Sequence, residues 1–150
     1  MRLPFRQPKL SLPTTPGHPM NPVAAYLSVG LGSALGGAAR YGCGLLAAAL
    51  WPVGFPWMTI LINTVGSFVI GLFATLAGPD GRLLVGTLGR QFVMVGLCGG
   101  YTTFSAFGLE TFDLLRGGRA VAAGANLVLS LALCLIAVWI GHRIARRLNQ

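Results

Sequence analysis

Four long apolar stretches follow one another from residue 23 onward, separated by short segments rich in glycine, proline or charge. They cover about 23–50, 57–77, 82–115 and 120–141. A membrane-spanning helix needs roughly 20 consecutive, mainly apolar residues, and each stretch is long enough. The pattern predicts an all-α membrane protein with four transmembrane helices.

The third stretch is too long for one straight crossing, and polar residues interrupt its middle. Two glycines and two threonines stand together over Gly99–Thr103, followed by Ser105. We expect two helical pieces that meet at Gly99–Thr103. Backbone groups freed by such a break cannot bond to lipid, so they must face protein, water or an ion. The alternative is a glycine packing notch in which threonine hydroxyls bond back to carbonyls.

Small and polar residues recur every fourth position in two other stretches. They are Thr59, Asn63, Ser67 and Gly71 in the second stretch and Asn126, Ser130 and Cys134 in the fourth. At helical spacing each set lies along one face. Such a face can serve packing alone, but a central asparagine must find partners for its amide. We interpret these faces as the walls of a hydrated path.

The first stretch is rich in small residues, and it contains one charge. Gly32 and Gly36 form a GxxxG pair, which lets membrane helices approach closely. Arg40 lies in the same stretch. A guanidinium at this depth either faces protein or water or extends to a headgroup, and the sequence leaves both alternatives open.

Beyond the interruption, two aromatic residues and a carboxylate carry candidate chemistry. Phe104 and Phe107 share a helical face, which is normally a core pattern, but ring edges are positive and can face an anion. Glu110 is the one carboxylate predicted near the membrane centre. It predicts either a proton relay or coupling site or a structural hydrogen bond to a neighbouring helix.

Composition supports the membrane assignment and excludes several functions. Only 9% of residues are charged, against about 25% in soluble domains. The net charge of +8 reflects basic residues at helix ends and a basic tail, and no nucleic-acid-binding motif accompanies it. No nucleophile–base pair, cofactor motif or metal-ligand spacing indicates an enzyme, and the three cysteines stand apart in apolar surroundings.

Residues 1–22 differ from the rest of the chain. They contain six prolines and three basic residues, so we expect a disordered basic tail before a membrane domain over 23–150. Four spans place both ends of the chain on one side, together with five arginines: Arg82, Arg90, Arg143, Arg146 and Arg147. The opposite side carries Arg116 and Arg119. This bias predicts cytoplasmic termini, and so few helices predict an oligomer, most often a symmetric dimer.

Several segments together resemble the CrcB/Fluc fluoride channel family. The most specific is Gly99-Gly100-Tyr101-Thr102-Thr103-Phe104-Ser105-Ala106-Phe107 with Glu110. Supporting segments stand in the same order: Gly36–Tyr41, Pro56–Thr59 with Asn63, and Asn126 with Ser130-Leu131. The resemblance covers about Val23 to Ile140.

The resemblance implies a passive, fluoride-selective channel in the inner (plasma) membrane that exports fluoride and so reduces its toxicity. It implies an antiparallel, dual-topology homodimer with two pores, in which carbonyls of Gly99 and Thr102 hold a structural Na+. The implied fluoride pathway contains Thr59, Asn63, Phe104, Ser105, Phe107, Asn126 and Ser130. Arg40 and Glu110 are expected to be structural or to stand at the pore entrance. Spread-out, weak contacts suit an ion that must also leave.

Some residues depart from this family pattern. Ala106 and Gly108 replace hydroxyl residues, Cys134 stands where serine can occur, and Asn126 stands where tyrosine is frequent. The basic bias also exceeds that of an unbiased dual-topology subunit, so a paired homologous subunit is the alternative partner. The alternative functions are a small multidrug-resistance-type proton-coupled exporter that uses Glu110, and a membrane scaffold for another subunit.

Overall fold

The computed structural model describes residues 21–50 and 54–150, so residues 1–20 of the predicted tail lie outside the described part. The described residues are helical almost throughout, with short turns between the helices. The elements are α1 (Pro22–Leu50), α2 (Trp57–Leu76), α3 (Thr87–Arg90), the π-helical segment η1 (Gln91–Cys98), α4 (Gly99–Tyr101), α5 (Phe104–Arg116) and α6 (Ala120–Leu148).

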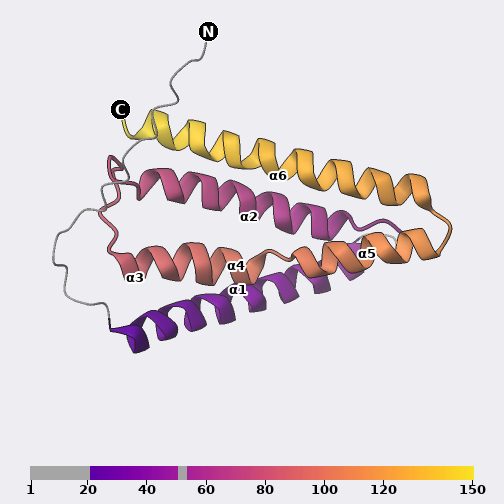
Figure 1. Ribbon diagram of the computed structural model, residues 1–150, viewed down its shortest axis with the longest axis horizontal. Helices are drawn as coiled ribbons and strands as arrows, with labels where there is room; N and C mark the ends of the chain where they lie inside the picture. Colours follow the sequence, from indigo (N-terminus) through magenta and orange to yellow (C-terminus); the bar gives the residue numbers. More distant parts are fainter. Residues whose placement is uncertain (1–20, 51–53) are drawn as a thin grey trace, which may run out of the picture.

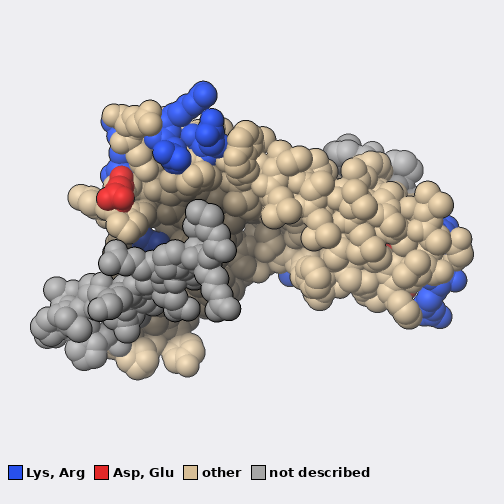
Figure 2. Space-filling view, turned by 45° about the horizontal axis from the view of Figure 1, so that its top comes forward, with Lys and Arg blue, Asp and Glu red and all other residues tan. Residues whose placement is uncertain are grey.

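Within residues 21–50 and 54–150, four helical spans are long and apolar enough to cross a membrane, as the sequence predicts. The third is composite: it runs from Thr87 to Arg116 through α3, η1, α4 and α5. Figure 1 shows the spans side by side, with the start of α1 and the C terminus at the same end. In the described ranges, basic side chains gather mainly toward the two ends of the long molecule (Figure 2).

Close packing of α1 against η1 and α4 depends on glycines in both partners. A Cβ on Gly32 would lie 2.4 Å from the Phe92 carbonyl oxygen, and one on Gly36 would lie 2.2 Å from that of Leu97. On α4, a Cβ added to Gly100 would lie 2.5 Å from the Ser33 carbonyl oxygen of α1. Because backbones touch here, dispersion contacts are dense where lipid provides no hydrophobic driving force. The predicted packing role of the GxxxG pair is confirmed.

The third span breaks inside the predicted range Gly99–Thr103, but the glycines themselves are helical. The chain leaves the helix at Thr102 (φ −79°, ψ 159°) and Thr103 (φ −150°, ψ 115°), and α5 begins at Phe104. Gly100 therefore belongs to the helix surface that packs on α1, whereas Gly99 has no atom of α1 within 4 Å of a Cβ built on it. The interruption is one extended step of the backbone.

Two predicted helix ends are wrong because tertiary contacts at one end of the bundle override the apolar pattern. Residues 82–86 are not helical, since the Arg82 amide donates to Asn149 Oδ1 (3.1 Å) and the segment folds back on the end of α2. The last helix continues to Leu148 instead of ending near 141. Asn149 also donates to the Thr75 carbonyl (3.2 Å), which joins the end of α6 to α2.

Candidate functional site

The extended step in the third span is held by one side chain from α2. Asn63 Nδ2 donates to the carbonyl of Thr103 (3.0 Å), and Asn63 Oδ1 accepts from the amide of Thr103 (2.8 Å). The amide side chain therefore replaces both backbone partners that Thr103 would have in a continuous helix. Thr103 in turn caps α5, because its Oγ1 accepts from the Ala106 amide (3.1 Å).

Because side chains take the place of backbone partners here, two carbonyls of the break lack their usual helical donors. In a continuous α-helix the Gly99 carbonyl would accept from Thr103, and the Thr102 carbonyl would accept from Ala106. Here the Thr103 amide donates to Asn63 and the Ala106 amide donates to the Thr103 side chain. Gly99 and Thr102 thus offer carbonyl oxygens to another donor or to a cation. Such groups in a membrane require a polar partner.

A hydrogen bond from Arg40 connects α1 to the residues just before the break. Its Nε donates to the Gly100 carbonyl at 3.2 Å, and the side chain is half-buried. Of the two alternatives that the sequence leaves open, the structure supports the one in which Arg40 faces protein.

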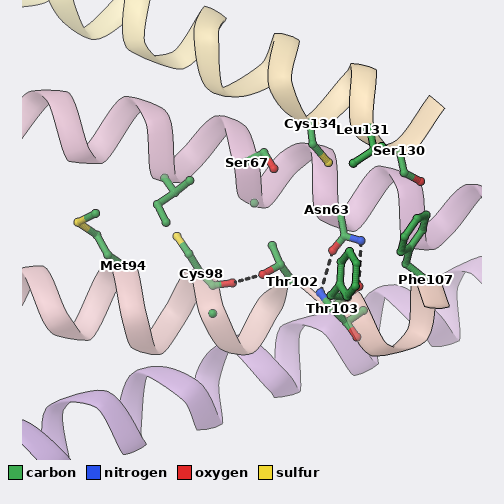
Figure 3. A pocket seen from close by; sticks show the side chains of 14 residues that line it. Asn63, Ser67, Met94, Cys98, Thr102, Thr103, Phe107, Ser130, Leu131 and Cys134 are labelled. Carbon is green, nitrogen blue, oxygen red and sulfur yellow. Dashed lines mark hydrogen bonds between the residues drawn. The ribbon is translucent and has the colours of Figure 1, made fainter. Parts of the chain in front are cut away.

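A cavity of about 330 Å³ opens beside the break between α2, η1 and α6. Figure 3 shows Asn63 and Ser67 from α2, Thr102 and Thr103 from the break, and Ser130 from α6 around this space. The other lining residues are Gly66, Ile70, Met94, Cys98, Gly99, Phe104, Phe107, Leu131 and Cys134. The cavity therefore combines an apolar wall with scattered hydroxyl and amide groups, an arrangement typical of sites for small polar ligands.

The two phenylalanines lie on the cavity wall with their rings tilted toward each other. Their centroids are 5.2 Å apart and their planes make an angle of 48°. Phe107 is 7% exposed, whereas Phe104 is 79% exposed. Phe107 is thus fixed by packing within the chain, while most of the Phe104 ring is open to a neighbouring molecule or lipid.

The predicted polar stripe on α6 splits into two parts. Ser130 and Cys134 line the cavity, but Asn126 is fully buried and does not. Asn126 Nδ2 donates to Thr111 Oγ1 (2.8 Å), and Ser130 Oγ donates to Asn126 Oδ1 (3.3 Å). Asn126 therefore connects α6 to α5 and orients Ser130. The sequence reasoning missed Thr111, although its position four residues after Phe107 places it on the same face of α5.

Glu110 and Thr59 belong to a second cavity, also about 330 Å³, which Arg40 lines as well. Thr59 Oγ1 donates to Glu110 Oε1 at 2.7 Å, which favours the predicted alternative of a structural bond to a neighbouring helix. Glu110 Oε2 is buried without a hydrogen-bond partner among the described residues. Ser105 lines neither cavity. It is exposed, and its Oγ lies 3.1 Å from Thr103 Oγ1.

Comparison with known proteins identifies close relatives over most of the chain. The model of the family described as "CrcB-like protein, Camphor Resistance (CrcB)" matches residues 27–142. A protein named fluoride-specific ion channel FluC 1, from Rhodopseudomonas palustris (strain BisB18), is 54% identical over 127 residues, which are 85% of this chain and 90% of the relative. A protein named fluoride-specific ion channel FluC, from Opitutus terrae, is 53% identical over 128 residues, which are 85% of this chain and 97% of the relative.

Proposed function

The chain belongs to the CrcB-like family, and from this premise we propose that it is a fluoride-selective channel that exports cytoplasmic fluoride by passive electrodiffusion. It is a multi-pass membrane protein and not an enzyme; in a bacterium its place is the inner membrane. The observation that carries the proposal is the cavity at the broken helix, lined by amide, hydroxyl and aromatic groups. Relatives named as fluoride channels do not support the exporter alternative.

The cavity suits a small anion that must bind and then leave. The Asn63 amide has a second N–H beyond the one bonded to Thr103, Ser130 adds a hydroxyl, and the Phe104 and Phe107 rings offer positive edges. No described lining residue carries a full charge. Weak donors in series lower the cost of dehydrating fluoride without trapping it.

Substitution of the rings tests this proposal directly. Phe107→Ile and Phe104→Ile should each strongly reduce fluoride efflux from liposomes that contain the purified protein. Phe112→Ile is the matched control, because Phe112 is an exposed ring of the same helix outside both cavities. Unchanged efflux in both ring variants, with folding intact, would remove the rings from the pathway.

A structural Na+ is proposed at the break. The carbonyls of Gly99 and Thr102 lack their usual helical donors, and carbonyl oxygen is a suitable ligand for a hard cation. Two carbonyls cannot surround an ion alone, so the same pair from a second subunit would complete the set. Replacement of Na+ by a large organic cation should lower the thermal stability of the dimer; an unchanged stability would contradict the site.

We also propose that the working unit is an antiparallel, dual-topology homodimer. Most of Phe104 and many large apolar side chains are exposed, and the proposed cation site is incomplete in one chain. A tag on residue 150 should be found on both sides of the membrane in cells. A single orientation would refute the homodimer and point to the paired homologous subunit.

The domain division is a proposal as well. We assign fluoride conduction to residues 23–150 and no part in it to residues 1–22. Removal of the tail should leave efflux per dimer unchanged, and a large loss would contradict this assignment.

A further inference from the structure

Three sulfur-containing side chains line the cavity beside the break. Met94 and Cys98 come from η1 and Cys134 comes from α6, and all three line the same space of about 330 Å³. The chain has three cysteines, and two of them line this cavity. The third, Cys43, is on α1 with its Sγ 3.6 Å from the Tyr101 hydroxyl, and it lines neither described cavity of this region.

The two cavity thiols approach the space from different helices. Figure 3 shows the Cys98 side chain pointing from η1 toward α2, and the Cys134 side chain pointing from α6 toward the same space. Cys98 is 4% exposed, whereas Cys134 is half-buried. Access to Cys98 is therefore from the cavity and not from the outer surface of the helix.

Both thiols stand one helical turn from polar residues that line the same cavity. Cys134 follows Ser130 by four residues on α6, and Cys98 precedes Thr102 by four residues, with Thr102 Oγ1 donating to the Cys98 carbonyl (2.9 Å). A group bound at either thiol would therefore occupy the space through which fluoride is proposed to pass.

The chemistry of this wall selects soft cations. Thiols and thioethers bind thiophilic metal ions in preference to hard cations such as Na+ or Mg2+. No described lining residue is a carboxylate. The sulfur atoms are the soft ligands of this lining, whereas the Gly99 and Thr102 carbonyls are hard oxygen ligands. Methylmercury, CH3Hg+, forms one S–Hg bond at a thiol and releases the thiol proton, with no change in oxidation state.

We propose that Cys98, which follows Met94 by one helical turn, and Cys134 each bind soft, thiophilic cations in the lining of the pathway, and that occupation of these thiols blocks fluoride flux. The block rests on the proposed channel function, whereas binding of the cation does not.

Methylmercury is the probe, and serine variants locate its target. Proteoliposomes of the wild type and of Cys98→Ser, Cys134→Ser, the double variant and Cys43→Ser are treated, washed and assayed for fluoride efflux. Each result is compared with the untreated efflux of the same variant. Intact-protein mass measurement counts the methylmercury groups on each protein.

Treated wild type and Cys43→Ser should lose efflux to the level of protein-free vesicles, and the double Cys98/Cys134 variant should keep its own untreated efflux. The mass of the wild type should show groups that the double variant lacks. The proposal is overturned if neither Cys98 nor Cys134 is modified, if modification leaves efflux unchanged, or if Cys43→Ser alone abolishes the block. An untreated wild type without efflux would instead refute the channel function, and the mass measurement would still decide whether the cation binds.

Discussion

Asn63 is the first residue to substitute, because its side-chain amide forms hydrogen bonds with both the N–H and the C=O of Thr103. Asn63→Leu keeps a similar side-chain volume and removes both hydrogen bonds. Since the N–H and C=O of Thr103 lie inside a membrane span, water is a poor substitute partner for them. We therefore expect Asn63→Leu to lower the free energy of unfolding through the loss of these two hydrogen bonds at the break.

The magnitude follows from the two bonds. A hydrogen bond between membrane helices contributes about 0.6 kcal/mol on average and about 1.7 kcal/mol at most. Two of them give roughly 1 to 3 kcal/mol, and unsatisfied backbone groups, which cost about 1–3 kcal/mol each, place the expected loss near the upper end. Asn63→Asp should lose a similar amount, because its second oxygen would face the Thr103 carbonyl at the present donor distance of 3.0 Å.

The free energy of unfolding in mixed micelles, followed by circular dichroism, measures this loss. Ser67→Ala is the matched control: Ser67 lies one turn along the same face of α2 and lines the same cavity. The control should change the free energy of unfolding by less than about 0.5 kcal/mol, as most mild substitutions do. A loss in Asn63→Leu no larger than that of the control would refute the assigned role of Asn63.

Three further substitutions test the packing and capping around the break. Gly36→Ala would place its Cβ 2.2 Å from the Leu97 carbonyl and should lower the unfolding free energy by about 1–3 kcal/mol, whereas Gly37→Ala, with open space around its Cβ, should be nearly neutral; equal thermal shifts would contradict the close contact. Thr103→Ala removes a helix cap and should cost about 1 kcal/mol, while Thr103→Ser should restore most of it in the same micelle unfolding assay; a failure of serine to do so would argue against the cap. Asn126→Leu should lower the unfolding free energy by about 1–3 kcal/mol, because the buried hydroxyls of Thr111 and Ser130 lose their hydrogen bonds to Asn126. An unchanged unfolding free energy would contradict that network.

The four spans were predictable because apolar length alone determines them. The start of the second span at Trp57 is confirmed, and the first begins within one residue of the predicted Val23. The end of the last span was not predictable, because contacts of His142 and Asn149 with Thr75, and not hydropathy, continue the helix.

The polar break was predictable in position but not in construction. Glycines in a long apolar stretch indicate an interruption, yet Gly100 is helical and serves the contact with α1. The bond that creates the extended step comes from Asn63, 40 residues earlier in the chain. Spacing along one helix cannot reveal such a pair.

The same limit explains Asn126, which the sequence pattern places with the cavity residues. Four-residue spacing puts it on one face with Ser130, but the neighbour of that face changes along α6, and only part of the face lines the cavity. Asn126 is buried and bonded to Thr111 on α5, whereas Ser130 and Cys134, one and two turns further along α6, line the cavity. The role of Asn126 in a fluoride pathway stays a prediction.

Ion efflux from liposomes that contain the purified protein tests the channel function most directly. With the membrane potential clamped by a potassium ionophore, electrodes for fluoride and for chloride follow both ions from the same vesicles. The account predicts rapid fluoride efflux and chloride efflux no faster than from protein-free vesicles. Fluoride efflux at the protein-free level from a well-folded preparation, or equal efflux of the two ions, would contradict it.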